Sequence, residues 1–395
     1  MLNVRADFPF LERKINGASI AYLDNAATTQ KPRQVIDRLT SLYVSGIANV
    51  HRAVNFLGDE TTREFERARE IIARFVGAQP REIIFTLNAT QSINLVCGSL
   101  SRAGRLRVIG NTQEHHSNLL PWIENAKVSF VPWSEDGTLD LAALEREAAR
   151  RPDLLAVSAA SNFLGTIQPV KEIVARCHGA GVKVLIDASQ SIAHQSHDVR
   201  EIGCDYLVFS GHKIYGPGGI GVLYAREELL EKMPPYFLGG SMVKEVHAAS
   251  WSPNDLPHCF EAGTPNIEGV IGLGAAIEYL ESLDWDRVAA HECALVQHAK
   301  RNLAALRGVR VYGPKSGQPS APLVSFQLKG LESNAVAKAL SNRGNVIVRS
   351  GFLCAQPAHD EFSAGPSVRA SFGIYNCKEE VDRMLDVIDS LLKAV

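Results

Sequence analysis

Short runs of apolar residues alternate along the chain with longer stretches in which apolar side chains recur every three or four positions. The short runs predict buried strands, and the recurring spacing predicts helices with one apolar face. The helical spacing is clear over residues 60–76 and 170–179. We expect strands at residues 82–85, 107–109, 127–131, 154–158, 182–186, 206–210 and 221–224. Strands that alternate with helices are typical of an α/β protein whose mainly parallel sheet is covered on both faces.

The pattern changes after Pro265. A long helical stretch over residues 267–306 is followed by a strand, a helix, a strand and a helix. This order favours a separate, smaller α+β domain. We therefore predict a large domain over residues 15–265 and a small carboxyl-terminal domain over residues 266–395.

Composition narrows the function classes. The 395 residues are 46% apolar, which is enough for a sizeable core. Because 41 basic residues nearly balance 43 acidic ones, neither nucleic acid nor a membrane surface is expected as the main partner. No stretch approaches the roughly 20 apolar residues of a membrane span, and residues 1–17 lack the apolar core of a signal peptide. We expect a cytoplasmic protein.

The seven cysteines have no regular spacing, so they predict neither a disulfide framework nor a metal site. We interpret four of them as small core residues: Cys97, Cys177, Cys204 and Cys293. Cys354 differs because glycine and proline flank it in RSGFLCAQP at 349–357, which follows an expected strand at 345–348. That punctuation predicts a loop, where a thiol is accessible for chemistry.

The strand at 206–210 ends in Ser210-Gly211-His212-Lys213, and a glycine-rich turn follows. A lysine in this place is often a solvated loop charge. Beside a hydroxyl and an imidazole, however, it can form a Schiff base next to a bound phosphate. These residues point to pyridoxal 5'-phosphate as the cofactor.

A second strand, at 182–186, ends at Asp187 and continues to Gln190. An ionised carboxylate there can hold the pyridine nitrogen of this cofactor protonated, and Gln190 can donate to its phenolic oxygen. A strand-end aspartate is also a common helix cap, so Asp187 alone is weak support.

Further motifs occur in order along nearly the whole chain: YLDNAATTQKP at 22–32, ANVHR at 48–52, QEHHSNLLPW at 113–122, SNFLGT at 161–166, FEAGTPN at 260–266 and RASFGIYN at 369–376. Together with the motifs around Asp187, Lys213 and Cys354, this set resembles the fold-type I enzymes of the class V aminotransferase superfamily. It is most similar to the group II cysteine desulfurases. The resemblance implies a large domain with a mainly parallel seven-stranded sheet, and a small domain that residues 1–14 also join.

The resemblance assigns residues to the cofactor. Ser210, His212 and Thr264 match phosphate ligands, and Thr264 would reach the cofactor of a neighbouring subunit, which implies a homodimer. Ala89 and Thr90 lie in the turn before an expected helix, whose amides suit an anion. Relatives usually have Gly-Thr-Thr where this chain has Asn88-Ala89-Thr90. Two more residues match contacts to the cofactor or substrate: His115, which would stack over the ring, and Asn162.

The resemblance also implies the reaction. Lys213 or a nearby histidine would remove the α proton of L-cysteine, and the Cys354 thiolate would take its sulfur as a persulfide, leaving L-alanine. Arg369 matches the arginine that grips the substrate carboxylate. The remaining residues assigned to the substrate are Arg349, Ala27 and His51, with Arg52 beside His51. An acceptor protein would then receive the sulfur, for iron–sulfur cluster assembly, a thiolated cofactor or a specialised metabolite.

One departure keeps alternatives open. Relatives generally carry His-His before the cysteine, whereas this chain has Phe352-Leu353, which deprives the thiol of a proton shuttle. Related reactions that need no persulfide are lysis of selenocysteine or cystine, β-elimination, and epimerisation of an unusual amino acid. A partner-binding scaffold that retains the cofactor fold is a further alternative, and the presence of Lys213 and Asp187 argues against it.

Overall fold

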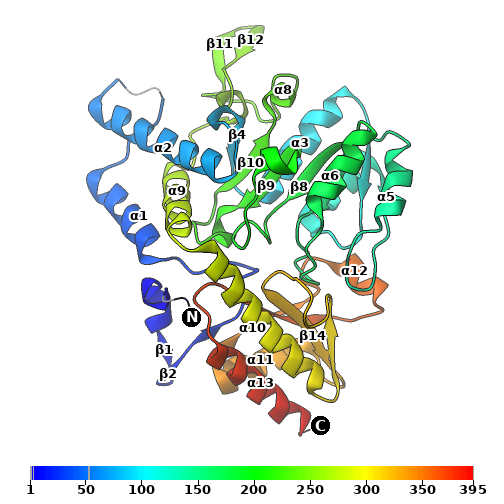
Figure 1. Ribbon diagram of the computed structural model, residues 1–395. Helices are drawn as coiled ribbons and strands as arrows, with labels where there is room; N and C mark the ends of the chain where they lie inside the picture. The colour runs from blue at the N-terminus through cyan, green and yellow to red at the C-terminus, as the bar shows by residue number, and fades with distance from the viewer. Residues whose placement is uncertain (1, 3, 52–53, 395) are drawn as a thin grey trace.

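A seven-stranded sheet flanked by helices forms the larger part of the molecule (Figure 1). The computed structural model describes residues 2, 4–51 and 54–394. Each of the predicted strands is present, with ends within one residue of the expected ones. They are β4 (Ile83–Thr86), β5 (Leu106–Gly110), β6 (Ala126–Phe130), β7 (Leu154–Ser158), β8 (Lys183–Asp187), β9 (Tyr206–Ser210) and β10 (Gly221–Ala225).

The strand order explains how distant motifs meet. The sheet runs β4-β10-β9-β8-β7-β5-β6, and only β10 is antiparallel to its neighbours. The mainly parallel sheet is therefore confirmed. Because β7, β8 and β9 are adjacent and parallel, their carboxyl ends lie at one edge, where ligands collect in such sheets. Asp187 and the segment that carries Lys213 lie at this edge.

The predicted helices are present with revised boundaries. α2 (Phe56–Phe75) begins earlier than expected because Asn55 caps it by accepting from the amide of Gly58. α6 (Val170–Gly179) matches its prediction. The single stretch predicted at 267–306 was wrong in one respect, since it forms two helices, α9 (Ile267–Glu281) and α10 (Trp285–Ala305). The break occurs where Asp284 caps α10.

A second, antiparallel sheet follows in the order β13 (Val309–Tyr312), β14 (Leu323–Leu328), β17 (Ser367–Ser371) and β16 (Arg349–Gly351). Helices α10, α11 (Ser333–Gly344) and α13 (Lys378–Leu392) lie beside it (Figure 1), and their buried apolar side chains form one cluster with those of the sheet. The loop predicted at 349–357 was wrong at both ends, because β16 pairs with β17 and α12 (Gln356–Glu361) begins at Gln356. Only residues 352–355 are irregular.

The two ends of the chain are tied together. Phe8 packs on Tyr375 with ring centroids 4.5 Å apart, and Arg5 pairs with Glu380 of α13 at 2.8 Å. Residues 21–22 form β3 (Ala21–Tyr22), which pairs with β15 (Val346–Ile347). The amino-terminal segment thus contacts the carboxyl-terminal region, although the division of the chain at residue 265 stays a prediction.

Two smaller expectations can be compared with the structure. Cys97, Cys177 and Cys204 are buried as expected, whereas Cys293 on α10 is exposed, because it lies on the outer face of that helix. Among the described residues, none of the helices combines the length and the apolar character needed to cross a bilayer.

Candidate active site

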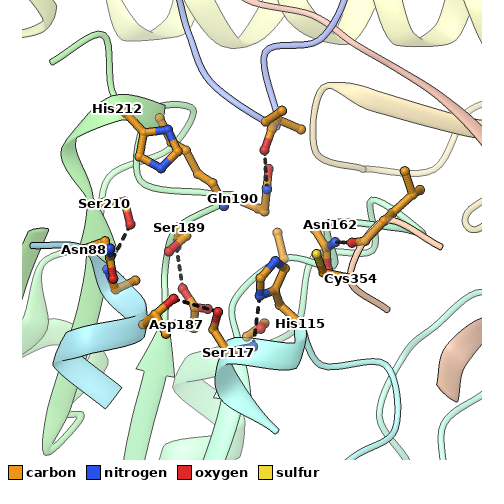
Figure 2. Close-up of a pocket in the computed structure, with 18 of the residues that line it drawn as sticks. Asn88, His115, Ser117, Asn162, Asp187, Ser189, Gln190, Ser210, His212 and Cys354 are labelled. Atoms are coloured by element: carbon orange, nitrogen blue, oxygen red, sulfur yellow. Dashed lines mark hydrogen bonds between the residues drawn. The ribbon is translucent and has the colours of Figure 1, made fainter. Parts of the chain in front are cut away.

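A cavity of about 390 Å³ lies at the carboxyl ends of β7, β8 and β9 (Figure 2). It is closed on the other side by the segment that carries Cys354 and by arginines of the second sheet. Most of the residues singled out in the sequence line it: Ala27, Ala89, Thr90, His115, Asn162, Asp187, Gln190, Ser210, His212, Lys213, Arg349, Cys354 and Arg369. The fold thus brings together motifs that are more than 300 residues apart.

Lys213 ends a short 3-10 helix, η6 (Gly211–Lys213), directly after β9. The carbonyl oxygen of His212 accepts from the amide of Thr29 at 3.0 Å and from the Thr28 hydroxyl at 3.2 Å, which fixes this turn to the amino-terminal segment. Burial lowers the pKa of Lys213, and the charge of Asp187 opposes this shift. A lowered pKa makes more of the amine available in its uncharged, nucleophilic form.

Asp187 is the last residue of β8, and its side chain is only 6% exposed. Its Oδ1 accepts from the backbone amide of Ser189 at 2.9 Å. The Oγ of Ser189 is buried and has no hydrogen-bond partner among the described residues. Gln190 donates from Nε2 to the carbonyl oxygen of Ala26 at 2.9 Å, so its amide bridges to the amino-terminal segment.

The amino terminus of α3 (Ala89–Leu100) also lines the cavity. Asn88 caps this helix by accepting from the amide of Gln91 at 3.0 Å, and the Ala89 amide donates to Ser210 Oγ at 2.9 Å. This close approach requires Gly221, because a Cβ there would lie 2.5 Å from the backbone of Asn88. The positive end of the helix dipole makes this part of the cavity suitable for an anion.

His115 is held as a neutral imidazole. Its Nδ1 accepts from the amide of Ser117 at 3.1 Å, which places the ring proton on Nε2. Burial and the nearby charge of Lys213 lower the pKa of His115 to about 4. Burial likewise lowers the pKa of His212 to about 4, with Lys213 and Lys31 contributing. Near neutral pH, both rings are therefore uncharged.

Glu114, beside His115, is a supporting residue that the sequence interpretation missed. It is 1% exposed and accepts from the side-chain amides of Asn111 and Asn118, each at 2.7 Å. It also accepts from the amide and hydroxyl of Ser158, at 2.9 and 2.5 Å. Because Ser158 ends β7, these bonds fix the His115 turn to the sheet. The sequence signal that could have identified Glu114 is its position directly before His115 and His116.

Two arginines meet a buried carboxylate at the mouth of the cavity. Arg349 and Arg369 lie opposite each other in the register of β16 and β17. Asp24 lies 2.9 Å from Arg349 Nη2 and 3.6 Å from Arg369 Nη2. Burial raises the pKa of Asp24 while both guanidinium groups oppose the shift, and burial lowers the pKa of Arg369 to about 10. Two cations and one anion leave one positive charge for a substrate carboxylate.

Asp24 was also missed as a site residue, although it belongs to the motif at 22–32. It interacts with the two arginines only because β3 and the segment after it run beside the second sheet, where Ser371 N donates to the Leu23 carbonyl at 2.8 Å. No pattern in the sequence gives this pairing.

The segment that carries Cys354 is strained and specifically held. Leu353 and Cys354 both have left-handed backbones, with φ of 54° and 55°. The carbonyl oxygen of Cys354 accepts from the amide of His116 at 2.8 Å, and that of Leu353 accepts from Asn162 Nδ2 at 2.6 Å (Figure 2). Leu353 is buried in an apolar cluster, and Cys354 is exposed at the cavity.

Two of the predicted residues lie elsewhere. Thr264 is exposed and does not line the cavity of this chain. His51 is also outside it and contacts Glu66. Arg52 lies outside the described residues. The assignment of Thr264 and His51 to a neighbouring subunit's site stays a prediction.

Known proteins resemble this chain over almost its whole length. A family model for class-V aminotransferases matches residues 21–384. A probable cysteine desulfurase of Synechocystis sp. is 42% identical, with 99% of this chain and 95% of the relative covered. A cysteine desulfurase of Enterobacter sp. is 41% identical, with 97% and 96% covered.

Solved structures of cysteine desulfurases are also similar to this chain. The apo structure of a cysteine desulfurase from Thermococcus onnurineus has a TM-score of 0.95 and 37% identity, covering 100% of this chain and 98% of that one. The cysteine desulfurase CsdA of Escherichia coli, crystallised in an S-sulfonic acid form, has a TM-score of 0.91 and 34% identity, covering 99% and 98%.

Proposed function

Because this chain belongs to the class-V aminotransferase family and, within it, to the cysteine desulfurases, we propose that it converts L-cysteine to L-alanine and transfers the sulfur to Cys354. One observation carries the proposal. An exposed cysteine lines the same cavity as a partly buried lysine and a buried aspartate, which lie at the ends of adjacent strands. A cofactor-bound amino acid and a protein thiol can therefore meet in one place.

The donor set of the cavity fits pyridoxal 5'-phosphate. The amino terminus of α3, with Thr90, Ser210 and His212, suits the dianionic phosphate. Asp187 would pair with a protonated ring nitrogen, and Ser189 Oγ, which has no hydrogen-bond partner among the described residues, offers a further polar contact. Lys213 supplies the amine for covalent attachment. When bound, this cofactor supplies an electron sink for negative charge at the substrate α carbon.

The arginine pair would hold the substrate. Arg369 is 3% exposed, and its Nε has no hydrogen-bond partner among the described residues. Its Nη1 is fixed by the carbonyl of Asn162 at 2.8 Å, which orients the guanidinium plane. A planar guanidinium pairs bidentately with a carboxylate, so the α-carboxylate of cysteine suits the residual positive charge beside Asp24.

The sulfur transfer needs a thiolate and a proton donor. Cys354 Sγ attacks the substrate sulfur, forming an S–S bond as the substrate Cβ–S bond breaks with its electron pair left on carbon. A proton then reaches that carbon, and the products are alanine and a Cys354 persulfide. The neutral His115 carries a proton on Nε2 inside the cavity, and Lys213 is the second group able to move one.

A homodimer and a sulfur acceptor complete the proposal. The exposure of Thr264 and His51 is consistent with their use by a second copy of the chain. The exposure of Cys354 would let an acceptor thiol reach the persulfide.

One feature favours a second candidate. Phe352 packs on His359 with centroids 5.5 Å apart, and Leu353 is buried, so the residues before Cys354 offer it no proton carrier. A lyase that releases sulfur or selenium without using Cys354 would tolerate this arrangement. Such an enzyme would keep its turnover after Cys354 is removed.

The test is an assay of the cofactor-loaded protein with L-cysteine, with and without a thiol reductant. Equal amounts of alanine and sulfide, with a persulfide trapped on Cys354, are expected. Sulfide release that stalls without reductant supports transfer through the cysteine. Pyruvate in place of alanine, or turnover that is independent of Cys354, would overturn it.

A further inference from the structure

Outside the cavity, three side chains with metal-ligating atoms converge from separate segments. They are His51, Glu66 on α2, and His258 in the short 3-10 helix η7 (His258–Phe260). One ligand atom of each lies within 4.8 Å of the other two. His51 Nε2 is 2.8 Å from Glu66 Oε1, and the rings of His51 and His258 have centroids 4.6 Å apart.

Buried groups behind this cluster hold it in place. Arg69, which is 1% exposed, donates from Nε to Glu66 Oε2 at 2.9 Å and pairs twice with Glu261 at 2.8 Å. The Nδ1 of His258 lies 3.8 Å from Glu261 Oε2. A histidine whose second ring nitrogen faces a carboxylate is the usual outer support of a metal ligand.

The charge of the region suits a cation. Glu66 and Glu261 contribute two negative charges and Arg69 one positive charge, so the carboxylates and the guanidinium leave one negative charge beside the two imidazoles. Burial acts to raise the pKa of Glu66, but the hydrogen bond from His51 and the charge of Arg69 lower it overall. Glu66 is therefore a ready anionic ligand.

A cavity of the single chain borders the cluster, and the backbone of His51 has an unusual conformation. His51 and His258 line a small cavity of about 120 Å³ that opens beside them. His51 has a left-handed backbone, with φ of 67°, and its amide donates to Thr62 Oγ1 at 3.0 Å. A backbone conformation of this kind costs free energy and is found preferentially at functional sites.

We propose that His51, Glu66 and His258 bind one divalent cation with the ligand preference of zinc. Two imidazoles and one carboxylate are a common zinc donor set, and a water molecule would fill the fourth position. The three ligand atoms lie within 4.8 Å of one another, which allows separations larger than those between two ligand atoms on one zinc ion. Because His51 and Glu66 are already 2.8 Å apart, a small movement of the His258 side chain toward them accompanies binding. The ion would tie the segment before α2 to the segment that leads into Thr264.

Zinc itself is the probe. The full-length, cofactor-loaded protein is stripped with a chelator, exchanged into chelator-free buffer and titrated with zinc by calorimetry, with bound metal then measured by elemental analysis. We expect one tight equivalent in the wild type. In His258→Gln and Glu66→Gln, we expect zinc affinity at this site to fall at least about tenfold, because removal of even an outer-shell partner of a metal site costs that much.

The controls separate this site from other ligands. His247→Gln is the matched variant, because His247 is an exposed histidine whose Nε2 lies 3.8 Å from Glu245, and no third ligand joins them among the described residues. It should bind as the wild type does. Cobalt(II) substituted at the site should lack the sulfur-to-cobalt charge-transfer band that Cys354 or Cys293 would give.

Three outcomes would overturn the proposal. They are no tight equivalent in the wild type, equal affinity in wild type and His258→Gln, or a cobalt spectrum dominated by thiolate. Because His258 is partly exposed, its variant should fold, and an unchanged cofactor absorption spectrum and unfolding temperature in chelator check this. The binding result does not depend on which reaction the cavity performs.

Discussion

The two walls of the large cavity are built differently. On one wall, Asp187, Ser158 and Ser210 end adjacent strands, whose backbone hydrogen bonds belong to the seven-stranded sheet. On the other wall, residues 352–355 are irregular, and side chains or single amides connect them to the first wall. The main connections are Asn162 to the Leu353 carbonyl and the His116 amide to the Cys354 carbonyl.

This difference separates two functions. The sheet-end wall carries the groups for the cofactor, and its geometry depends on the core of the large domain. The loop wall carries the nucleophile, and each hydrogen bond that holds it contributes only about 1 kcal/mol net. Substitutions on the loop wall should therefore change sulfur transfer while cofactor binding persists, and the reverse should hold for the sheet-end wall.

The largest effect is expected on the sheet-end wall, from Lys213→Ala. Without its amine, the protein loses covalent cofactor attachment and a group able to move the α proton, so turnover of cysteine should fall by roughly 10³-fold or more. The measurement is alanine production together with the cofactor absorption spectrum. Lys31→Ala, which alters a neighbouring lysine with a pKa lowered by burial to about 8, is the control. Comparable losses in both variants would contradict a specific role.

The sharpest test of the separation is Cys354→Ala on the loop wall. Persulfide formation should disappear and catalytic alanine production should fall at least about 100-fold, because no other group in the cavity is a soft nucleophile. The cofactor spectrum should not change. Cys293→Ser, at the other cysteine assigned as exposed, should behave as the wild type. If Cys354→Ala loses cofactor as well, the two walls are not independent.

Sequence reasoning served the sheet-end wall well because its signals are local. A buried apolar run ends at Asp187, another ends just before Lys213, and adjacent parallel strands must end at one edge. The strand positions needed only hydrophobic periodicity. The boundary at Ser282–Asp284 was missed because a helix cap interrupts the chain without breaking the apolar pattern.

The loop wall was less predictable because its contacts are long-range. Asp24 meets Arg349 and Arg369 only because β16 pairs with β17 and the amino-terminal segment pairs with β15 and with Ser371 of β17. The position of Leu353 and Cys354 depends on left-handed backbones that favour glycine, which a sequence of Phe, Leu and Cys does not signal. Tertiary contacts determine both the interaction of Asp24 with the arginines and the backbone conformation of Leu353 and Cys354.

Substrate affinity should distinguish the two arginines. Arg369→Gln removes a buried cation, so KM for cysteine should rise about 10- to 100-fold, the equivalent of roughly 1.5–3 kcal/mol for hydrogen bonds to a charged group. Arg349 has a side chain that is 50% exposed, and Arg349→Gln should raise KM only a few-fold because solvent screens it. Steady-state kinetics and binding of a cysteine analogue without the α-carboxylate provide the measurement. Equal effects of the two substitutions would show that burial does not set the contribution.

The smallest expected effect concerns pH and the support of the loop wall. His359 is fully buried under Phe352, donates from Nδ1 to the Ala355 carbonyl at 2.9 Å, and accepts at Nε2 from Ser367 Oγ at 3.0 Å. Burial lowers the pKa of His359, so the unfolded chain binds this proton at a higher pH than the folded chain does. The free energy of unfolding should therefore fall as pH drops below about 6.5, the ordinary histidine value.

His359→Gln keeps a donor and an acceptor but cannot titrate. Its free energy of unfolding, measured by denaturant titration at pH 7.5 and pH 5.5, should fall less with acidification than that of the wild type. His115 and His212 on the sheet-end wall, each with a pKa of about 4, retain their share of the pH dependence in both proteins. An identical slope in His359→Gln would mean that proton uptake at His359 does not destabilise the fold, and that the loop wall is no more sensitive to acid than the sheet that faces it.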